Sequence, residues 1–368
     1  MGDTNTPFYT GKYFAEAEDI IFVTVNYRTN IFGFPGAPGA DTNLGLRDQR
    51  AAVEWVKNNA KSFGGDPKKI TISGQSSGGV SVDYWTYAYK DDPIANAIYA
   101  PSGNAFSFPV NAPGVPEEHW NEVVEAVGCG GADDTLACMR EVDWQDIKEA
   151  AAGVRPTPSS SPLRSIPAFY PQPDEKYVFS DYLSLTEAGS FAKIPVLMGN
   201  NNNEDGFYRI PAFANGVVPT DEQVRIFLLE SFTCPVSFQA RARRQHDVPA
   251  WTYRYMADWE NTRLYNTSGA YHGVDLHMFL GASGDVSGIP PSAEQKKLTK
   301  YTQQALRAFC NNPWDALHDF GWEMFSDSEN SLAVIGEDEK ARAEFVKPSV
   351  YDAACSTITL GALNTPSS

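Results

Sequence analysis

A serine in a glycine-flanked turn is the strongest candidate nucleophile in the 368-residue sequence. Gly74-Gln75-Ser76-Ser77-Gly78 fits the pattern G-x-S-x-G. In this pattern the serine lies at the tip of a strained turn, where its exposed hydroxyl can attack a carbonyl carbon. The backbone N–H of Ser77 would begin the next helix and face the oxyanion that forms beside Ser76. The spacing therefore predicts acyl transfer through Ser76.

Such a serine needs a base and an orienting carboxylate. In the α/β-hydrolase fold, where the G-x-S-x-G turn is found, they follow in the order serine, acid, histidine. Five histidines are candidates for the base: His119, His246, His272, His277 and His318. His272 is preferred because it lies in a glycine-flanked loop after a predicted strand. Glu204 and Asp205 both lie in the polar loop that follows the strand predicted at residues 194–199. Spacing alone does not choose between these two acids.

Predicted strands and helices alternate around these residues. Apolar, β-branched or alternating stretches predict strands, and apolar stripes of helical period predict helices. The strands are expected at residues 19–26, 70–73, 95–100, 194–199 and 251–256, and the helices at 44–63, directly after Ser76, and from a capping box at 292–295 to residue 309. Residues 110–162 have little strand pattern and predict a largely helical region. This order indicates an α/β fold with a mostly parallel sheet.

Composition excludes several classes of function. The formal net charge of −17 disfavours nucleic acid as a partner, because an acidic surface repels phosphate. The sequence has no apolar run of about 18 residues, so no membrane span is predicted. The five cysteines form no C-x-x-C pair, so a zinc site is not expected.

Several blocks of the sequence resemble the type-B carboxylesterase family, also called the cholinesterase/lipase family, and most of all its fungal esterase branch. These blocks are residues 26–28, 32–34, 43–49, 63–79, 199–207 and 270–276. The resemblance implies the α/β-hydrolase fold, with a mostly parallel central sheet flanked by helices. It implies one domain over residues 1–368, in which 110–162 is a cap-like helical insertion. The implied activity is hydrolysis of carboxylic esters.

The resemblance also implies a role for each site residue. Ser76 would attack the ester, His272 would move its proton, and Glu204 would orient His272. The oxyanion would be held by the N–H of Ser77. No metal or cofactor is implied, and the partner is a small-molecule ester. The oligomeric state and the identity of the ester stay open.

Cysteines and a sequon indicate an oxidising compartment. Short spacing together with the resemblance predicts a Cys129–Cys138 disulfide, and the resemblance alone predicts Cys234–Cys355, which leaves Cys310 free. Asn266-Thr267-Ser268 is an N-glycosylation sequon. By resemblance the protein is expected to be secreted, although the sequence has no secretory signal at its start.

Two departures from the family pattern affect the expected activity. Gln75 stands where the family usually has glutamate, which argues against a choline ester. The family's H-G-G-G loop, which supplies further oxyanion donors, is absent from residues 1–368. We therefore expect an N-terminally truncated chain with weak activity. A non-catalytic, cholinesterase-like binding module is the alternative from another class, and a peptidase or lactonase on the same fold is a further enzyme alternative.

Overall fold

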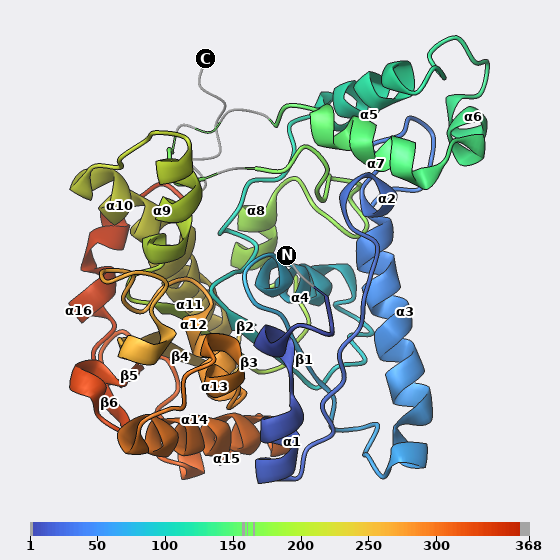
Figure 1. Cartoon of the computed structure of the whole chain (residues 1–368). Helices are drawn as coiled ribbons and strands as arrows, with labels where there is room; N and C mark the ends of the chain where they lie inside the picture. Colours follow the sequence, from blue (N-terminus) through green and yellow to red (C-terminus); the bar gives the residue numbers. More distant parts are fainter. Residues whose placement is uncertain (1–2, 157–158, 160, 165, 361–368) are drawn as a thin grey trace.

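A six-stranded sheet forms the centre of the structure (Figure 1). The structure is a computed structural model that describes residues 3–156, 159, 161–164 and 166–360. The strands are β1 (Thr71–Ser73), β2 (Ala97–Pro101), β3 (Val196–Asn201), β4 (Ala250–Tyr255), β5 (Leu332–Ile335) and β6 (Ala343–Val346). They lie in sequence order, with β1 to β5 parallel and β6 antiparallel to β5. The mostly parallel sheet predicted from the sequence is confirmed.

Side chains alternate across the sheet and build a core on each face, as the pleat of a strand requires. On one face Tyr99 and Trp251 pack with Phe309. On the other face Ile98 and Met198 pack with side chains of two helices. Every residue of β2, β3 and β4 is buried, which is typical of strands covered on both faces.

Helices surround the sheet (Figure 1). The longer helices are α1 (Lys12–Glu18), α3 (Leu44–Asn59), α4 (Ser77–Ala88), α5 (Val115–Ala126), α6 (Thr135–Glu141), α7 (Trp144–Gly153), α8 (Tyr182–Glu187), α9 (Asp205–Ala214), α10 (Asp221–Leu228), α11 (Cys234–Gln245), α12 (Val274–Phe279) and α14 (Ala293–Asn311). The short ones are α2 (Asn30–Gly33), α13 (Ser283–Ser287), α15 (Ala316–Asp319) and α16 (Ser349–Asp352). Single turns are η1 (Pro7–Tyr9), η2 (Ala60–Phe63), the π-helical η3 (Leu229–Thr233), η4 (Glu260–Thr262), η5 (Glu337–Glu339) and η6 (Ala353–Thr357).

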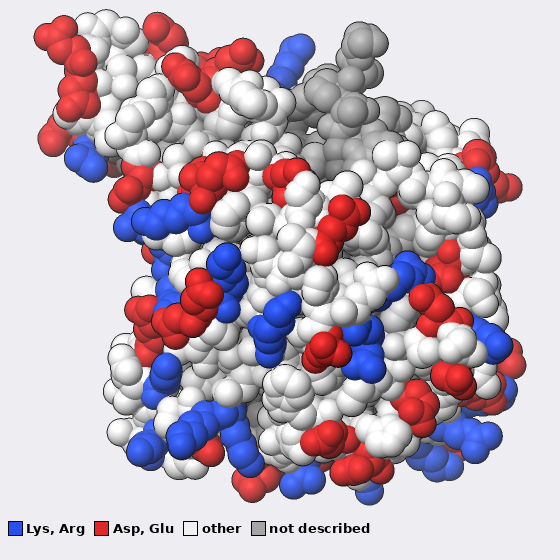
Figure 2. All heavy atoms as spheres, turned by 180° about the vertical axis from the view of Figure 1, so that it is seen from behind, with Lys and Arg blue, Asp and Glu red and all other residues white. Residues whose placement is uncertain are grey.

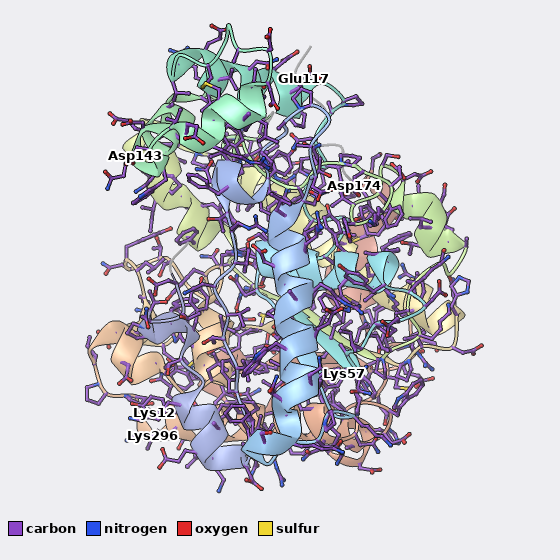
Figure 3. The ribbon with its side chains drawn as sticks, turned by 90° about the vertical axis from the view of Figure 1, so that its right-hand side faces the viewer. Lys12, Lys57, Glu117, Asp143, Asp174 and Lys296 are labelled. Carbon is purple, nitrogen blue, oxygen red and sulfur yellow. A yellow bond between two sulfur atoms is a disulfide. The ribbon has the colours of Figure 1, made fainter. Side chains whose placement is uncertain are left out.

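Local signals in the sequence account for several of these boundaries. The predicted capping box is present at the start of α14, where Ser292 and Gln295 each bond the other's backbone N–H. The helix predicted over 44–63 is present as α3 and the turn η2, and Gly64 follows with φ +82°. Figure 3 shows α3 along the outer side of the molecule, with Lys57 in its last turn.

The prediction of a strand at residues 19–26 is wrong. Among the described residues this segment has no strand partner, and its apolar side chains Ile21, Val23 and Val25 are 51%, 49% and 42% exposed. Its apolar pattern suits a strand, but a strand also needs a neighbour to pair its backbone N–H and C=O groups. The described sheet instead ends at β1, which is three residues long.

Helices α5, α6 and α7 form a separate corner of the molecule within the residues 110–162 predicted to be helical (Figure 1). They have their own apolar core, which includes Trp120, Val123 and Ile147. Acidic side chains gather on the surface of this corner (Figure 2), where Figure 3 labels Glu117 and Asp143.

Candidate active site

Ser76 lies in a strained turn between β1 and α4. Its backbone has φ +60° and ψ −119°, a conformation that non-glycine residues rarely adopt. A Cβ atom at Gly74 would lie 2.3 Å from the backbone of Gly78, and one at Gly103 would lie 2.1 Å from the carbonyl oxygen of Ser76. Side chains at these glycines would clash with backbone, so the glycines let the chain turn sharply enough to present Ser76.

The loop after β3 brings Glu204 to His272. Oε2 of Glu204 lies 2.5 Å from Nδ1 of His272, and both side chains are buried. Asp205 is engaged elsewhere, since its carboxylate pairs with Arg209 one turn along α9. The geometry therefore distinguishes two neighbouring acids that spacing alone left equivalent, and it places on His272 the one that the resemblance implied.

Buried polar groups hold the Glu204 carboxylate in place. Its Oε1 accepts hydrogen bonds from the Ser102 hydroxyl at 2.7 Å and from the Asn201 backbone N–H at 2.6 Å. The Asn201 side chain also donates to Asp275 at 3.0 Å, and the Tyr253 hydroxyl donates to Asp275 at 2.6 Å. Burial raises the pKa of Asp275, and the nearby Glu204 carboxylate acts in the same direction. Sequence reasoning did not assign these supporting residues a role, and only Ser102 and Asn201 follow the ends of predicted strands.

The other ring nitrogen of His272 is hydrogen-bonded to Gln75 and not to the serine. Nε2 of His272 lies 3.0 Å from Nε2 of Gln75, the residue that precedes Ser76. The structure thus brings Glu204 and His272 together, with Gln75 rather than Ser76 bonded to the second ring nitrogen. The sequence did not predict that Gln75 would bond His272.

Aromatic side chains pack around His272. The ring centroids of Tyr208 and Phe232 lie 5.0 and 5.3 Å from that of His272. Phe227 packs edge-on against Tyr208, and Leu163 belongs to the same apolar cluster. Burial and the Glu204 carboxylate raise the pKa of Tyr208, so its hydroxyl stays protonated at neutral pH.

The N-terminus of α4 lies directly after Ser76. Ser77 is the first residue of this helix, so its backbone N–H has no partner within the helix. Ser77 is also exposed. A helix N-terminus favours negative charge. This arrangement is suited to stabilising an oxyanion on a substrate bonded to Ser76.

The remaining histidines lie in other environments. His277 is fully buried between the Ser283 and Tyr271 hydroxyls, at 3.0 and 3.3 Å. His119 is also buried, and its Nδ1 contacts the carbonyl oxygen of Ala168. His246 bonds the carbonyl oxygen of Glu187, and His318 pairs with Glu323 at the surface.

The burial of His277 predicts a loss of stability in mild acid. Burial lowers the pKa of His277 to about 4, from an ordinary 6.5. As the pH falls, His277 is protonated in the unfolded chain before it is protonated in the folded chain, which favours unfolding. The stability held by neutral His277 is therefore complete above about pH 6.5 and is lost between there and about pH 4. The loss is about 3 kcal/mol in the free energy of unfolding.

Urea unfolding at about pH 7 and about pH 4.5 measures this contribution. His277→Gln is expected to lose less stability between the two pH values than the wild type does. The surface variant His318→Gln should follow the wild type. A wild type and a His277→Gln variant with equal pH dependence would contradict the prediction.

Comparison with known proteins connects this site to a family. Residues 1–228 match the sequence profile of the carboxylesterase family. The chain belongs to the carboxylesterase family. The resemblance inferred from the motifs is confirmed, and the fold agrees with the α/β-hydrolase fold that the family implies.

Similar proteins of the carboxylesterase family include fungal lipases and esterases. "Secreted lipase 5" of Gibberella zeae is 31% identical, over 96% of this chain and 69% of its own length. "Chlorogenic acid esterase" of Aspergillus niger is 31% identical, over 89% of this chain and 65% of its own length. "Lipase 4" of Diutina rugosa is 34% identical, over 58% of this chain and 40% of its own length. The chain thus spans about two thirds of the length of the first two relatives.

Two disulfides brace this carboxylesterase chain. Cys129–Cys138 closes a short loop between α5 and α6, and Cys234–Cys355 ties α11 to the turn η6. Cys310 is a free thiol. Asn266 is exposed on the loop before His272, so the sequon is accessible. No helix of the described residues is long and apolar enough to cross a membrane.

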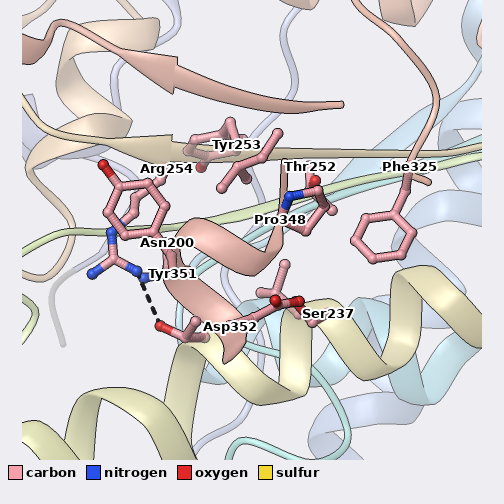
Figure 4. Close-up of a pocket in the computed structure, with 12 residues that line it drawn as sticks. Asn200, Ser237, Thr252, Tyr253, Arg254, Phe325, Pro348, Tyr351 and Asp352 are labelled. Carbon is pink, nitrogen blue, oxygen red and sulfur yellow. Dashed lines mark hydrogen bonds between the residues drawn. The ribbon is translucent and has the colours of Figure 1, made fainter. Parts of the chain in front are cut away.

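A small internal cavity lies apart from Ser76 and His272 (Figure 4). It has a volume of about 20 Å³ and is lined by residues of β3, β4, α11 and α16. Arg254 on β4 stacks on Tyr351 and donates to the Thr233 hydroxyl at 3.1 Å. Burial lowers the pKa of Arg254 to about 10. The volume suffices for one water molecule, which is too small for a substrate site.

Proposed function

We propose that this chain is a carboxylic ester hydrolase that uses Ser76, His272 and Glu204 through an acyl-enzyme intermediate. The observation that carries the proposal is the contact of 2.5 Å between Glu204 and His272, beside a serine held at φ +60°. A nucleophile, a base and an orienting carboxylate are the three groups that acyl transfer requires. Membership of the carboxylesterase family supports the same reaction.

Each residue has a defined part in the proposed reaction. His272 takes the proton of the Ser76 hydroxyl while Oγ bonds to the ester carbonyl carbon. The tetrahedral oxyanion is held by the Ser77 N–H at the start of α4. His272 then gives its proton to the leaving alcohol, and water attacks the acyl-enzyme by the same route in reverse. Glu204 keeps the Nδ1–H tautomer of His272 and stabilises the imidazolium.

The surroundings of His272 support an apolar acyl group. Tyr208 is half-buried beside the base, and the buried Phe227 and Phe232 pack against it. Burying an acyl chain against the exposed part of Tyr208 is favourable in proportion to the apolar area removed from water. The substrate class we propose is therefore neutral esters of apolar acids.

Secretion of the protein is part of the proposal. Two relatives are named as secreted lipases. Two disulfides and an exposed sequon at Asn266 suit an oxidising, glycosylating compartment. The acidic residues of α5–α7 keep one corner of the surface strongly charged (Figure 2), which favours solubility.

Reaction with an alkyl fluorophosphonate tests the proposed nucleophile. We expect one covalent adduct on the tryptic peptide that contains Ser76, and loss of p-nitrophenyl ester hydrolysis in step with labelling. The Ser76→Ala variant provides the blank. An adduct on another serine, or hydrolysis that survives complete labelling, would rule out Ser76 as the nucleophile.

A further inference from the structure

The hydrogen bonds of His272 define which of its ring nitrogens carries the proton. The Glu204 carboxylate can only accept, so Nδ1 of His272 donates to it at 2.5 Å. In the neutral ring Nε2 is then an acceptor with one lone pair. The group that lies 3.0 Å from this lone pair is the Gln75 side-chain nitrogen, which must donate. Gln75 therefore occupies the position from which His272 would take a proton.

The acceptor that the first step needs is therefore engaged by Gln75. Ser76 must donate its proton to Nε2 of His272, and that lone pair accepts one strong hydrogen bond at a time. Moving from this arrangement to the reactive one exchanges the Gln75 hydrogen bond for one from the Ser76 hydroxyl, without breaking a covalent bond.

The backbone on either side holds Gln75 at this position. Gln75 directly precedes Ser76, so the strained turn fixes where its side chain begins. Gly273 follows His272 with φ +88°, and a Cβ atom there would lie 3.3 Å from Nε2 of Gln75 and 3.1 Å from the ring of Phe8. The Gln75 amide thus lies next to Gly273, where any larger residue would place a side chain in the space that the amide occupies.

We propose that Gln75 is a positioning residue that holds His272 in a resting state, and that substrate binding replaces its amide with the Ser76 hydroxyl at Nε2. This inference rests on the proposed ester hydrolase function. It assigns Gln75 a part in controlling that site. The site is closed to proton transfer until the exchange occurs, so the exchange precedes acylation of Ser76.

The size of the effect follows from the strength of one hydrogen bond. Removing the competing amide should speed acylation roughly two- to tenfold, the factor that a typical net hydrogen bond represents. A donor on Nε2 also stabilises the neutral ring against protonation. Without that donor the acid limb of the kcat/KM profile should move to higher pH, by roughly half to one unit.

Two substitutions separate this role from a purely structural one. Gln75→Leu keeps the approximate shape and removes the donor. Gln75→Glu provides an acceptor that favours the doubly protonated ring, so its acid limb should move further to higher pH than that of Gln75→Leu. The titratable groups that face His272 from the loop after β3, from α9 and from α12 are Glu204, Tyr208 and Asp275. Both substitutions leave these three groups in place.

The kinetic experiment measures the second-order rate of fluorophosphonate labelling of Ser76 against pH. On the alkaline plateau Gln75→Leu should react two- to tenfold faster than the wild type. The matched control is Gln145→Leu, an exposed glutamine on α7 that should behave as wild type. An unchanged plateau together with an unchanged acid limb in Gln75→Leu would overturn the proposal.

Nitrogen NMR tests the resting hydrogen bond without relying on catalysis. In protein labelled with ¹⁵N-histidine, the Nε2 resonance of His272 is assigned by its loss in His272→Asn. In the wild type it should be displaced from that of a free acceptor nitrogen, and Gln75→Leu should move it towards the free value. An identical resonance in both proteins would overturn the proposal. The two proposals can fail separately. If the resonance differs between wild type and Gln75→Leu but the fluorophosphonate never labels Ser76 in the wild type, the proposed function is overturned instead.

Discussion

Replacing Glu204 by glutamine is expected to lower kcat/KM for ester hydrolysis roughly 10⁴-fold, while Asp205→Asn leaves it close to wild type. A glutamine amide can present its NH₂ group to Nδ1 and so favour the tautomer that lacks a proton there, which leaves Nε2 unable to act as base. Glu204 contacts Nδ1 of His272 directly, whereas Asp205 pairs with Arg209 one turn along α9.

Hydrolysis of p-nitrophenyl butyrate measures this pair of variants, with Ser76→Ala as the blank. Thermal unfolding of each variant checks that Asp205→Asn and Glu204→Gln are folded. Glu204 is buried with three hydrogen-bond donors, so the isosteric glutamine is preferred to alanine. A larger loss in Asp205→Asn than in Glu204→Gln would show that the acid has been assigned to the wrong residue.

A longer chain that carries a glycine-rich H-G-G-G loop upstream of Met1 is expected to raise kcat roughly 10²–10³-fold over residues 1–368. Removing one oxyanion donor from a related kind of site typically costs that factor, which corresponds to about 3–4 kcal/mol. Residues 1–368 hold the Ser77 N–H after the nucleophile but no H-G-G-G sequence.

Parallel assays of the two chain lengths on short p-nitrophenyl esters provide the measurement. Each chain is corrected by its own Ser76→Ala variant, so that only hydrolysis through Ser76 is counted. Equal Ser76-dependent rates would show that the N–H of Ser77, with groups already present in residues 1–368, suffices for the oxyanion.

The sequence predicted the elements that have strong local signals. The strand before Ser76, the helix after it and the capping box at Ser292 depend on neighbours within a few residues, and all three are present. The segment 19–26 has an equally clear apolar pattern but no partner strand among the described residues, and pairing partners are not encoded locally. The short strands β5 and β6 were not predicted, because four residues carry little periodicity.

The residues of the candidate site were predictable in type but not in their contacts. The motif located Ser76, and order along the chain favoured His272. The choice between Glu204 and Asp205 depends on how the backbone enters α9, which places one carboxylate on His272 and the other on Arg209. The engagement of His272 by Gln75 depends on a side-chain rotamer beside a glycine, for which the sequence contains no pattern.

The Cys234–Cys355 disulfide has a consequence for a chain that meets proteases. His272 lies between the two cysteines, whereas Ser76 and Glu204 precede both. The loop before His272 has an exposed stretch at residues 263–267 in which Leu264 is 44% exposed, so it is open to cleavage. A nick there would leave two polypeptides joined by the disulfide, which would migrate as one species until reduced. The histidine would therefore stay covalently attached to the half that carries the serine and the glutamate.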